Sequence, residues 1–152
     1  EILEMHIEED TSKSIHSKER TLLDFNRAGV PLIEIVTKPC IKTSKEATLY
    51  LEKLRELLLY AGVSDCKIEE GSMRADVNVS IRKKESDPWG TKAEIKNIGS
   101  ISNAGLSVEK EIERQQKQAE SNQKNCTVLL HNHSPDAHLF SVIHPVQTSA
   151  VK

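Results

Sequence analysis

Apolar and polar residues alternate along the first part of the chain, which is the pattern of half-buried β-strands. The predicted strands cover residues 3–7, 21–25 and 30–36, and the polar segment at residues 11–20 is expected to be a loop. The third strand is almost entirely apolar, and a single carboxylate, Glu34, interrupts it. That interruption makes Glu34 a candidate functional residue, because charged side chains are seldom buried without a partner.

A helix is predicted next, because a capping box precedes apolar residues spaced three and four apart. The box consists of Thr43 at the N-cap and Glu46 three residues later, and Gly62 supplies the C-terminal stop. The apolar stripe is Ala47, Tyr50, Leu51, Leu54, Leu57, Leu58 and Ala61. We expect this stripe to be buried against a sheet.

The second half of the chain predicts a β-hairpin followed by a helix. The predicted elements are a strand at residues 74–82, a turn at 85–90, a strand at 91–98 and a highly charged helix at 102–124. The first of these strands has one aliphatic and one polar face. The helix has few apolar residues beyond Ile112, so its far end should fray. Residues 126–152 show no periodicity that identifies an element.

Composition then narrows the function classes. The chain has 152 residues and a formal net charge of −2, and its pI is about 6.3. Domains that bind nucleic acid by electrostatics alone usually have a pI above about 9, so a basic nucleic-acid-binding module is disfavoured. No apolar run approaches the roughly 18 to 20 residues that span a bilayer. Three cysteines without a CxxC pair favour a reducing compartment.

Carboxylates gather at positions that suit a hard divalent cation. They are Glu8, Glu9 and Asp10 at the end of the first strand, Glu34 inside the third, and Glu69 and Glu70 ahead of a glycine. Mg²⁺ takes a few carboxylate oxygens and leaves room for water and phosphate. The alternative is that these are ordinary surface acids, and the pattern leaves both interpretations open.

A second candidate is the polar face of the strand at residues 74–82. Arg74, Asp76 and Asn78 point the same way, and Glu94 and Lys96 could lie beside them on the neighbouring strand. Such a row suits phosphate or carboxylate groups. The alternative is a solvated face with exposed ion pairs worth at most about 1 kcal/mol each.

Other known site signatures are missing. Neither GxxxxGK[ST] nor GxGxxG occurs, so any nucleotide must be held by a different scaffold. The C-terminal region contains Cys126, His131, His133, His138 and His144. These lack the short paired spacings of zinc sites, so metal binding there is disfavoured.

Six consecutive segments carry a resemblance to one known family. They are HIEEDTSKSIH (6–16), LLDFNRAGVPLIEIVTKP (22–39), YLEKLRELLLYAGVSD (50–65), EEGSMRADVNVSIR (69–82), WGTKAEIKN (89–97) and EKEIERQ (109–115). In this order they resemble the GatB family, the B subunits of the aspartyl/glutamyl-tRNA amidotransferases. The resemblance covers about residues 3–118.

The resemblance implies transamidation during translation. The family activates the side-chain carboxylate of a tRNA mischarged with glutamate or aspartate, using ATP and Mg²⁺ to form an acyl phosphate. Ammonia from a partner amidase subunit then replaces the phosphate, and a third, small subunit braces the pair. The mischarged tRNA is bound mainly through domains that lie outside this sequence. The implied location is the bacterial cytoplasm, with a mitochondrion or plastid as alternatives.

The resemblance also implies site residues. Glu9 and Glu34 match the metal-coordinating acids of the family, and Glu8 stays open as the alternative to Glu9 because adjacent strand residues point oppositely. The implied catalytic residues are Arg74, Asp76, Asn78, Glu94 and Lys96, and the implied cofactor-binding residues are Arg74, Lys96 and Asn97.

Taken together, these expectations describe an α+β domain with an antiparallel-sheet cradle and packed helices. Residues 1–118 are expected to form part of the catalytic cradle domain of the family, and residues 119–152 a divergent tail without an assigned fold. The chain begins without Met inside a predicted strand, so we expect a central piece of a longer protein. The rival hypothesis is a truncated, non-catalytic fragment that retains only partner-subunit binding.

Overall fold

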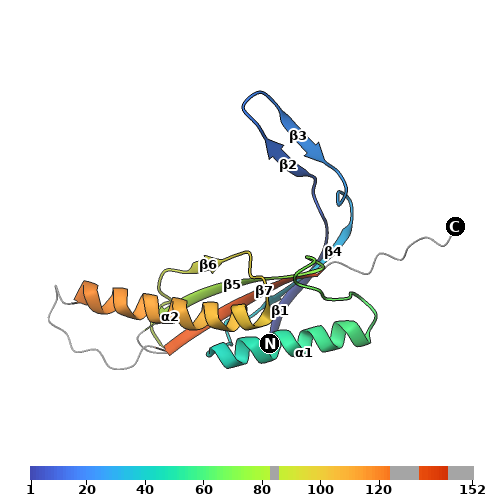
Figure 1. Cartoon of the computed structure of the whole chain (residues 1–152). Helices are drawn as coiled ribbons and strands as arrows, with labels where there is room; N and C mark the ends of the chain where they lie inside the picture. The colour runs from blue at the N-terminus through green and yellow to red at the C-terminus, as the bar shows by residue number, and fades with distance from the viewer. Residues whose placement is uncertain (83–85, 124–133, 144–152) are drawn as a thin grey trace.

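The computed structural model describes residues 1–82, 86–123 and 134–143. The elements are β1 (Ile2–Glu9), β2 (Lys13–His16), β3 (Thr21–Asp24), β4 (Pro31–Thr37), α1 (Ser44–Tyr60), β5 (Met73–Arg82), β6 (Ala93–Ile95), α2 (Ile101–Gln123) and β7 (Ser134–Ile143). Five strands form one sheet in the order β1-β4-β7-β5-β6, and all its pairs are antiparallel. This arrangement, with both helices packed on the sheet, confirms the predicted α+β class (Figure 1).

The hydrophobic core lies between one face of the sheet and the two helices. On β5 every second residue, from Met73 to Ile81, is buried. Those from Met73 to Val79 share one core with Leu51 of α1 and with Ala104 and Val108 of α2. Burial of each large aliphatic side chain stabilises the fold by about 1.5–3 kcal/mol. The core face of β5 therefore holds the sheet and helices together.

The start of α1 agrees with the predicted capping box. The Thr43 hydroxyl accepts a hydrogen bond from the Glu46 N–H at 3.1 Å, and the Glu46 carboxylate accepts one from the Lys42 N–H at 2.6 Å. At the other end, Ala61 is the C-cap. Gly62 follows with φ +65°, a conformation that glycine adopts without strain.

The predicted burial of the whole α1 stripe is wrong for part of it. Ala47, Leu51 and Leu54 are buried, but Leu57 is 66% exposed and Ala61 is exposed as well. Tyr50 and Leu58 are partly buried against the core. The reason is geometric, since the sheet and α2 cover a narrower stripe of α1 than the apolar pattern spans.

The segment at residues 11–20, predicted to be a loop, contains β2. This strand pairs with β3, placing Ile15 opposite Leu22 and His16 opposite Thr21. A hydrogen bond at 3.0 Å joins His16 Nδ1 and Thr21 Oγ1. The polar residues around Ile15 hid the alternation that marks a strand. The β2–β3 hairpin projects away from the sheet (Figure 1).

The predicted hairpin between β5 and β6 is confirmed, although β6 is shorter than expected. Asn78 lies opposite Glu94 in this pairing. The returning chain lies close to β5, because the Gly90 N–H donates to the Ile81 carbonyl at 3.1 Å. A Cβ added at Gly90 would lie 2.6 Å from that oxygen, so the close approach requires glycine.

The helix predicted at residues 102–124 is present as α2, but its packing extends past Ile112. Gln115 is buried and donates its Nε2 hydrogen to the Val79 carbonyl at 2.9 Å. The expectation of weak packing beyond Ile112 is therefore wrong at Gln115. Its buried amide fixes α2 to β5 by a hydrogen bond, and a pattern of apolar residues does not reveal such a contact. The predicted fraying at the end of α2 stays a prediction, because the helix ends next to residues that the structure does not describe.

β7 comes from the region to which no element was assigned. Its backbone pairs with β4 on one side and with all of β5 on the other. Among the zinc candidates considered above, Cys126, His131, His133 and His144 lie outside the described residues. In the part of the chain that the structure describes, neither helix combines the length and apolarity needed to cross a membrane.

Candidate functional site

Strand register brings Glu34 and Arg74 to the same face of the sheet. Glu34 of β4 and Arg74 of β5 are both paired with position 142 of β7, from opposite sides. Directly paired residues of antiparallel strands project to the same face, and two strand spacings amount to about 10 Å. Because the neighbours of Arg74 along β5 belong to the core, this shared face is the one turned away from the helices. We call it the open face.

The same reasoning decides between Glu8 and Glu9, the two candidate metal-binding acids of β1. His6 is paired with Glu34 and Glu8 with Leu32, so Glu8 shares the open face with Glu34. Glu9 is paired with Pro31 and projects to the opposite face. The predicted pairing of Glu9 with Glu34 is therefore not assembled here, and the alternative, Glu8, is the acid that the register brings to Glu34.

Charged residues of β5, of β6 and of the position directly after β6 form a second group on the open face. Burial raises the pKa of Asp76, and the nearby charge of Glu94 raises it further, whereas Lys96 and Arg74 lower it. Lys96 Nζ lies 3.4 Å from Glu94 Oε1. The structure therefore places four of the predicted catalytic residues within electrostatic reach of one another.

The polar face of β5 becomes more buried along the strand. Arg74 is exposed and Asp76 partly buried, whereas Asn78 is only 1% exposed. Neither amide atom of Asn78 has a hydrogen-bond partner within the described residues. Beyond it, the Ser80 hydroxyl donates to the Gly90 carbonyl at 2.9 Å. A fully solvated face, the alternative raised above, describes the Arg74 end of β5 and not the end at Ser80.

Asn97 lies two residues after the end of β6 and is exposed. Its φ of +59° is in the left-handed region, which asparagine tolerates better than most residues. This turn sets the direction in which the chain leaves Lys96. A role for Asn97 in cofactor binding stays a prediction.

A pocket of about 500 Å³ lies beside Arg74, at the base of the β2–β3 hairpin. Its lining residues are Asp10, Thr11, Ser12, Lys13, Asp24, Asn26, Arg27 and Arg74. Asp10 Oδ2 lies 3.0 Å from Arg27 Nε and 4.0 Å from Arg74 Nη2. Sequence reasoning missed Arg27, because a turn residue carries no periodic signal. Asp10 was noted only as part of an acidic triplet, although it has the same strand parity as Glu8.

The donor set allows a limited metal site. The described residues contain no group of three or more His, Cys, Asp or Glu side chains that could hold a metal ion. Mg²⁺, however, is commonly bound through one or two carboxylates together with water and substrate phosphate. Glu34 and Glu8, which share the open face, fit that smaller requirement.

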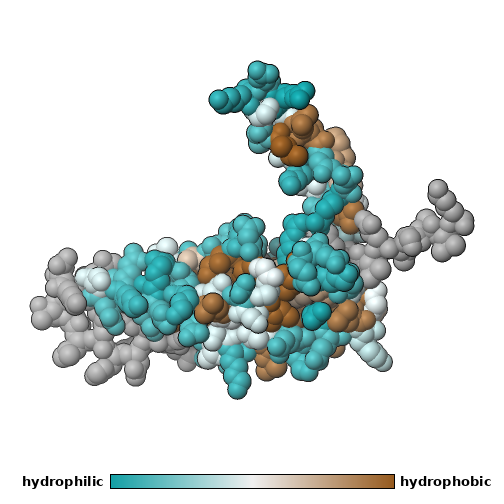
Figure 2. All heavy atoms as spheres, in the orientation of Figure 1, coloured by the Kyte–Doolittle hydropathy of each residue, from teal (hydrophilic) through white to brown (hydrophobic). Residues whose placement is uncertain are grey.

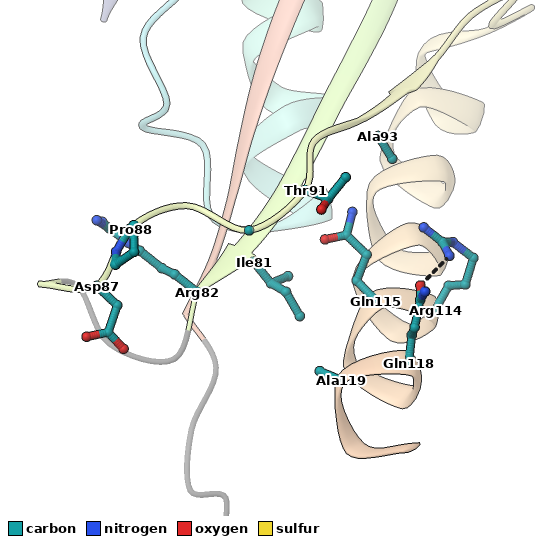
Figure 3. Close-up of a pocket in the computed structure, with 11 residues that line it drawn as sticks. Ile81, Arg82, Asp87, Pro88, Thr91, Ala93, Arg114, Gln115, Gln118 and Ala119 are labelled. Carbon is teal, nitrogen blue, oxygen red and sulfur yellow. Dashed lines mark hydrogen bonds between the residues drawn. The ribbon is translucent and has the colours of Figure 1, made fainter. Parts of the chain in front are cut away.

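A second pocket, of about 680 Å³, lies on the helix side of the sheet (Figure 3). It is bounded by the end of β5, the segment at residues 87–91 and the second half of α2. None of the predicted site residues lines it. Arg114 in its wall donates to Glu111 at 2.6 Å and to Gln118 at 3.0 Å, and the Glu111 bond lowers the pKa of that carboxyl. The predicted chemistry is therefore concentrated on the open face.

Comparisons with known proteins agree with the sequence resemblance. The GatB/GatE catalytic domain family matches residues 1–144, which includes β7. The B subunit of an aspartyl/glutamyl-tRNA(Asn/Gln) amidotransferase from Mycoplasma mycoides is 56% identical over 117 residues, covering 77% of this chain and 24% of that protein. The protein of the same name from Clostridium kluyveri is 53% identical over 120 residues, covering 79% and 25%. That from Bacillus thuringiensis is 49% identical over 117 residues, covering 77% and 25%. The chain thus spans about a quarter of the length of these curated relatives.

Proposed function

Because this chain belongs to the GatB/GatE catalytic domain family, we propose that it acts as part of a tRNA-dependent amidotransferase in translation. The proposed reaction converts Glu-tRNA(Gln) or Asp-tRNA(Asn) to Gln-tRNA(Gln) or Asn-tRNA(Asn). ATP first phosphorylates the side-chain carboxylate, and ammonia from the amidase subunit then displaces phosphate. The proposed assembly consists of the B subunit, the amidase subunit and a small third subunit. Its proposed location is the bacterial cytoplasm.

The observation that carries this proposal is the placement of Glu34 and Arg74 in one row of the open face. Phosphoryl transfer depends mainly on positioning and on neutralising the charge of the transferring oxygens. Arg74 and Lys96 bind those oxygens, the former through its planar fork and the latter as a point charge. Glu34 and Glu8, which share the open face, would hold Mg²⁺, and the ion would supply further charge neutralisation.

Asp76 is proposed to act in the second step. Attack of ammonia on the acyl phosphate forms the amide bond, breaks the bond to phosphate and leaves one proton to be removed. A carboxylate with a raised pKa is a better proton acceptor at neutral pH than an ordinary one. Asn78 and Glu94 flank Asp76 on the open face and complete the proposed row.

The test is Glu34→Gln in the complete enzyme, assembled with the amidase and small subunits. We expect ADP release in response to mischarged tRNA to fall by at least about 100-fold, because a charge-stabilising group is lost. The melting temperature should stay near that of the unsubstituted enzyme, since glutamine has the same shape. Glu52→Gln on the solvent side of α1 is the matched control. Unchanged Mg²⁺ dependence in Glu34→Gln would contradict the proposal.

Two further variants separate the faces of β1 in the same assay. Glu8→Gln should raise the Mg²⁺ concentration needed for half-maximal rate about tenfold, as losses around a metal commonly do. Glu9→Gln should leave that concentration unchanged, because Glu9 projects to the other face. The reverse result would restore Glu9 as the metal ligand.

The alternative is a non-catalytic piece that only binds partner subunits, and surface apolarity favours it. All eight residues of β1 are exposed, Ile7 by 83%. The projecting β2–β3 hairpin also carries hydrophobic surface, including Leu22 and Leu23 (Figure 2). Mixing the 152-residue chain with the two partner subunits separates the hypotheses. Release of ADP in the presence of mischarged tRNA supports the enzymatic hypothesis. Binding to the amidase subunit without ADP release supports the non-catalytic hypothesis.

A further inference from the structure

Asp10 is held more firmly than its position after β1 suggests. Its N–H donates to the Val30 carbonyl at 2.8 Å, and its carbonyl accepts from the Gly29 N–H at 2.9 Å. Its Oδ1 accepts from the Thr11 N–H at 2.9 Å, and the side chain is only 14% exposed. Backbone and carboxylate are therefore both fixed at the wall of the pocket beside Arg74.

Two guanidinium groups from distant parts of the chain meet at this carboxylate. Arg27 comes from the turn after β3, and Arg74 comes from β5. Both lie within 4.0 Å of the same oxygen, Asp10 Oδ2. Arg27 also donates from Nη2 to the Gly71 carbonyl at 3.4 Å. The two cations are thus brought close together by one anion between them.

The charge of the pocket favours an anionic ligand. Among the residues that the structure describes, the pocket is lined by three cationic side chains, Lys13, Arg27 and Arg74, and by the two carboxylates of Asp10 and Asp24. Guanidinium groups bind phosphate oxygens through paired, charge-assisted hydrogen bonds. Thr11 and Ser12 also line the pocket, and a hydroxyl group can serve as a neutral hydrogen-bond donor.

We propose that this pocket binds a phosphate group of the substrate through Arg27 and Arg74, and that Asp10 is the positioning residue that holds both guanidiniums. This inference rests on the proposed function, since it names part of the same site. Without Asp10, two like charges this close repel each other and turn away from the pocket. The carboxylate therefore strengthens anion binding, although its own charge opposes an anion.

The test is whether removing the Asp10 charge weakens or strengthens anion binding. The probe is inorganic pyrophosphate, titrated into the 152-residue chain and followed by NMR at the Nε–Hε groups of arginine. In the unsubstituted chain, the Arg27 and Arg74 signals should shift. Asp10→Asn should weaken pyrophosphate binding about tenfold, which corresponds to one charge-assisted hydrogen bond.

Asp24→Asn is the charge-matched control. It removes one carboxylate from the same pocket, and its amide oxygen can still accept the bond that Asp24 Oδ1 accepts from the Asn26 N–H at 2.9 Å. This variant should bind pyrophosphate as tightly as the unsubstituted chain, or more tightly. If Asp10→Asn behaves in the same way as Asp24→Asn, the pocket acts through net charge alone and the positioning role is overturned.

Arg27→Lys keeps the test decisive should Asp10→Asn fail to fold. Lysine retains the charge but loses the planar fork, so pyrophosphate binding should weaken about tenfold. Unchanged binding in Arg27→Lys, or absence of any shift at Arg27 and Arg74 in the unsubstituted chain, overturns the proposal.

The source of the phosphate is decided by two further ligands. ATP represents the nucleotide, and the dinucleotide CpA represents the phosphodiester of an RNA end. The one that shifts the Arg27 and Arg74 signals at lower concentration identifies the source. Failure of both, with pyrophosphate binding intact, would leave an adventitious anion only and overturn the substrate assignment. Pyrophosphate binding by the chain without amidation by the complete enzyme would instead count against the proposed function alone.

Discussion

The two faces of β5 differ in what buries them. On the helix side, every second residue from Met73 to Val79 is packed into one hydrophobic core. On the open side, the strand runs from exposed Arg74 through Asp76 to buried Asn78. A single strand therefore supplies much of the folding free energy from one face and the candidate chemistry from the other. Substitutions of neighbouring residues should separate stability from activity.

The largest effect is expected on the core face. Met73→Ala should lower the free energy of unfolding by about 2–5 kcal/mol, because a fully buried side chain leaves a cavity. Urea denaturation of the 152-residue chain measures it. Leu57→Ala on the exposed side of α1 should change it by less than about 0.5 kcal/mol. A loss in Met73→Ala as small as that in Leu57→Ala would mean that burial on the core face of β5 contributes little to the folding free energy.

The neighbouring residue should show the opposite behaviour. Arg74→Ala is expected to lower amidation by the complete enzyme about 100-fold, because a phosphate-binding guanidinium is lost. The free energy of unfolding should fall by no more than about 1 kcal/mol, since the side chain is 49% exposed and its ion pair is partly solvated. Arg55→Ala on the exposed side of α1 is the matched control. A loss of stability as large as that of Met73→Ala would return Arg74 to a structural role.

The smallest effect concerns the pH dependence of Asp76. Burial raises the pKa of this carboxyl in the folded state above its ordinary value of 3.8, so ionisation disfavours the fold. The unsubstituted chain should therefore lose stability relative to Asp76→Asn as the pH rises from below 3.8 through the folded-state pKa. Above that range the difference should be constant.

Urea denaturation of both chains at a series of pH values measures this difference. The comparison cancels groups with the opposite sign, such as Glu111, whose pKa the Arg114 hydrogen bond lowers. A stability advantage of the unsubstituted chain that grows with pH would show that Lys96 and Arg74 outweigh burial at Asp76.

Local patterns predicted the elements that depend on neighbouring residues. The capping box at Thr43 located the start of α1, because its cap bonds span only three or four residues. The alternation along residues 74–82 located β5 and its two faces, because strand parity is a local property. β2, which lies within residues 11–20, was not predicted, because Ile15 alone is not enough to show alternation.

The candidate site was predictable only in part. Arg74 and Asp76 could be placed on one face from their spacing, and they share the open face. That Glu8, and not Glu9, accompanies Glu34 depends on which residues of β1 and β4 are paired. The contact of Asp10 with Arg27 and Arg74 joins three segments far apart in the sequence. No periodic signal marks such a contact.

The sequence by itself determined the family, the α+β class, the position of α1 and the two-faced character of β5, because family motifs, caps and strand parity can all be recognised in short stretches of chain. The tertiary structure decided the place of β7 between β4 and β5, which aligns Glu34 with Arg74 across the sheet. It also decided the burial of Asn78 and the meeting of two arginines at Asp10. These features arise from strand pairing between distant segments, whose register is set by the packing of the whole sheet.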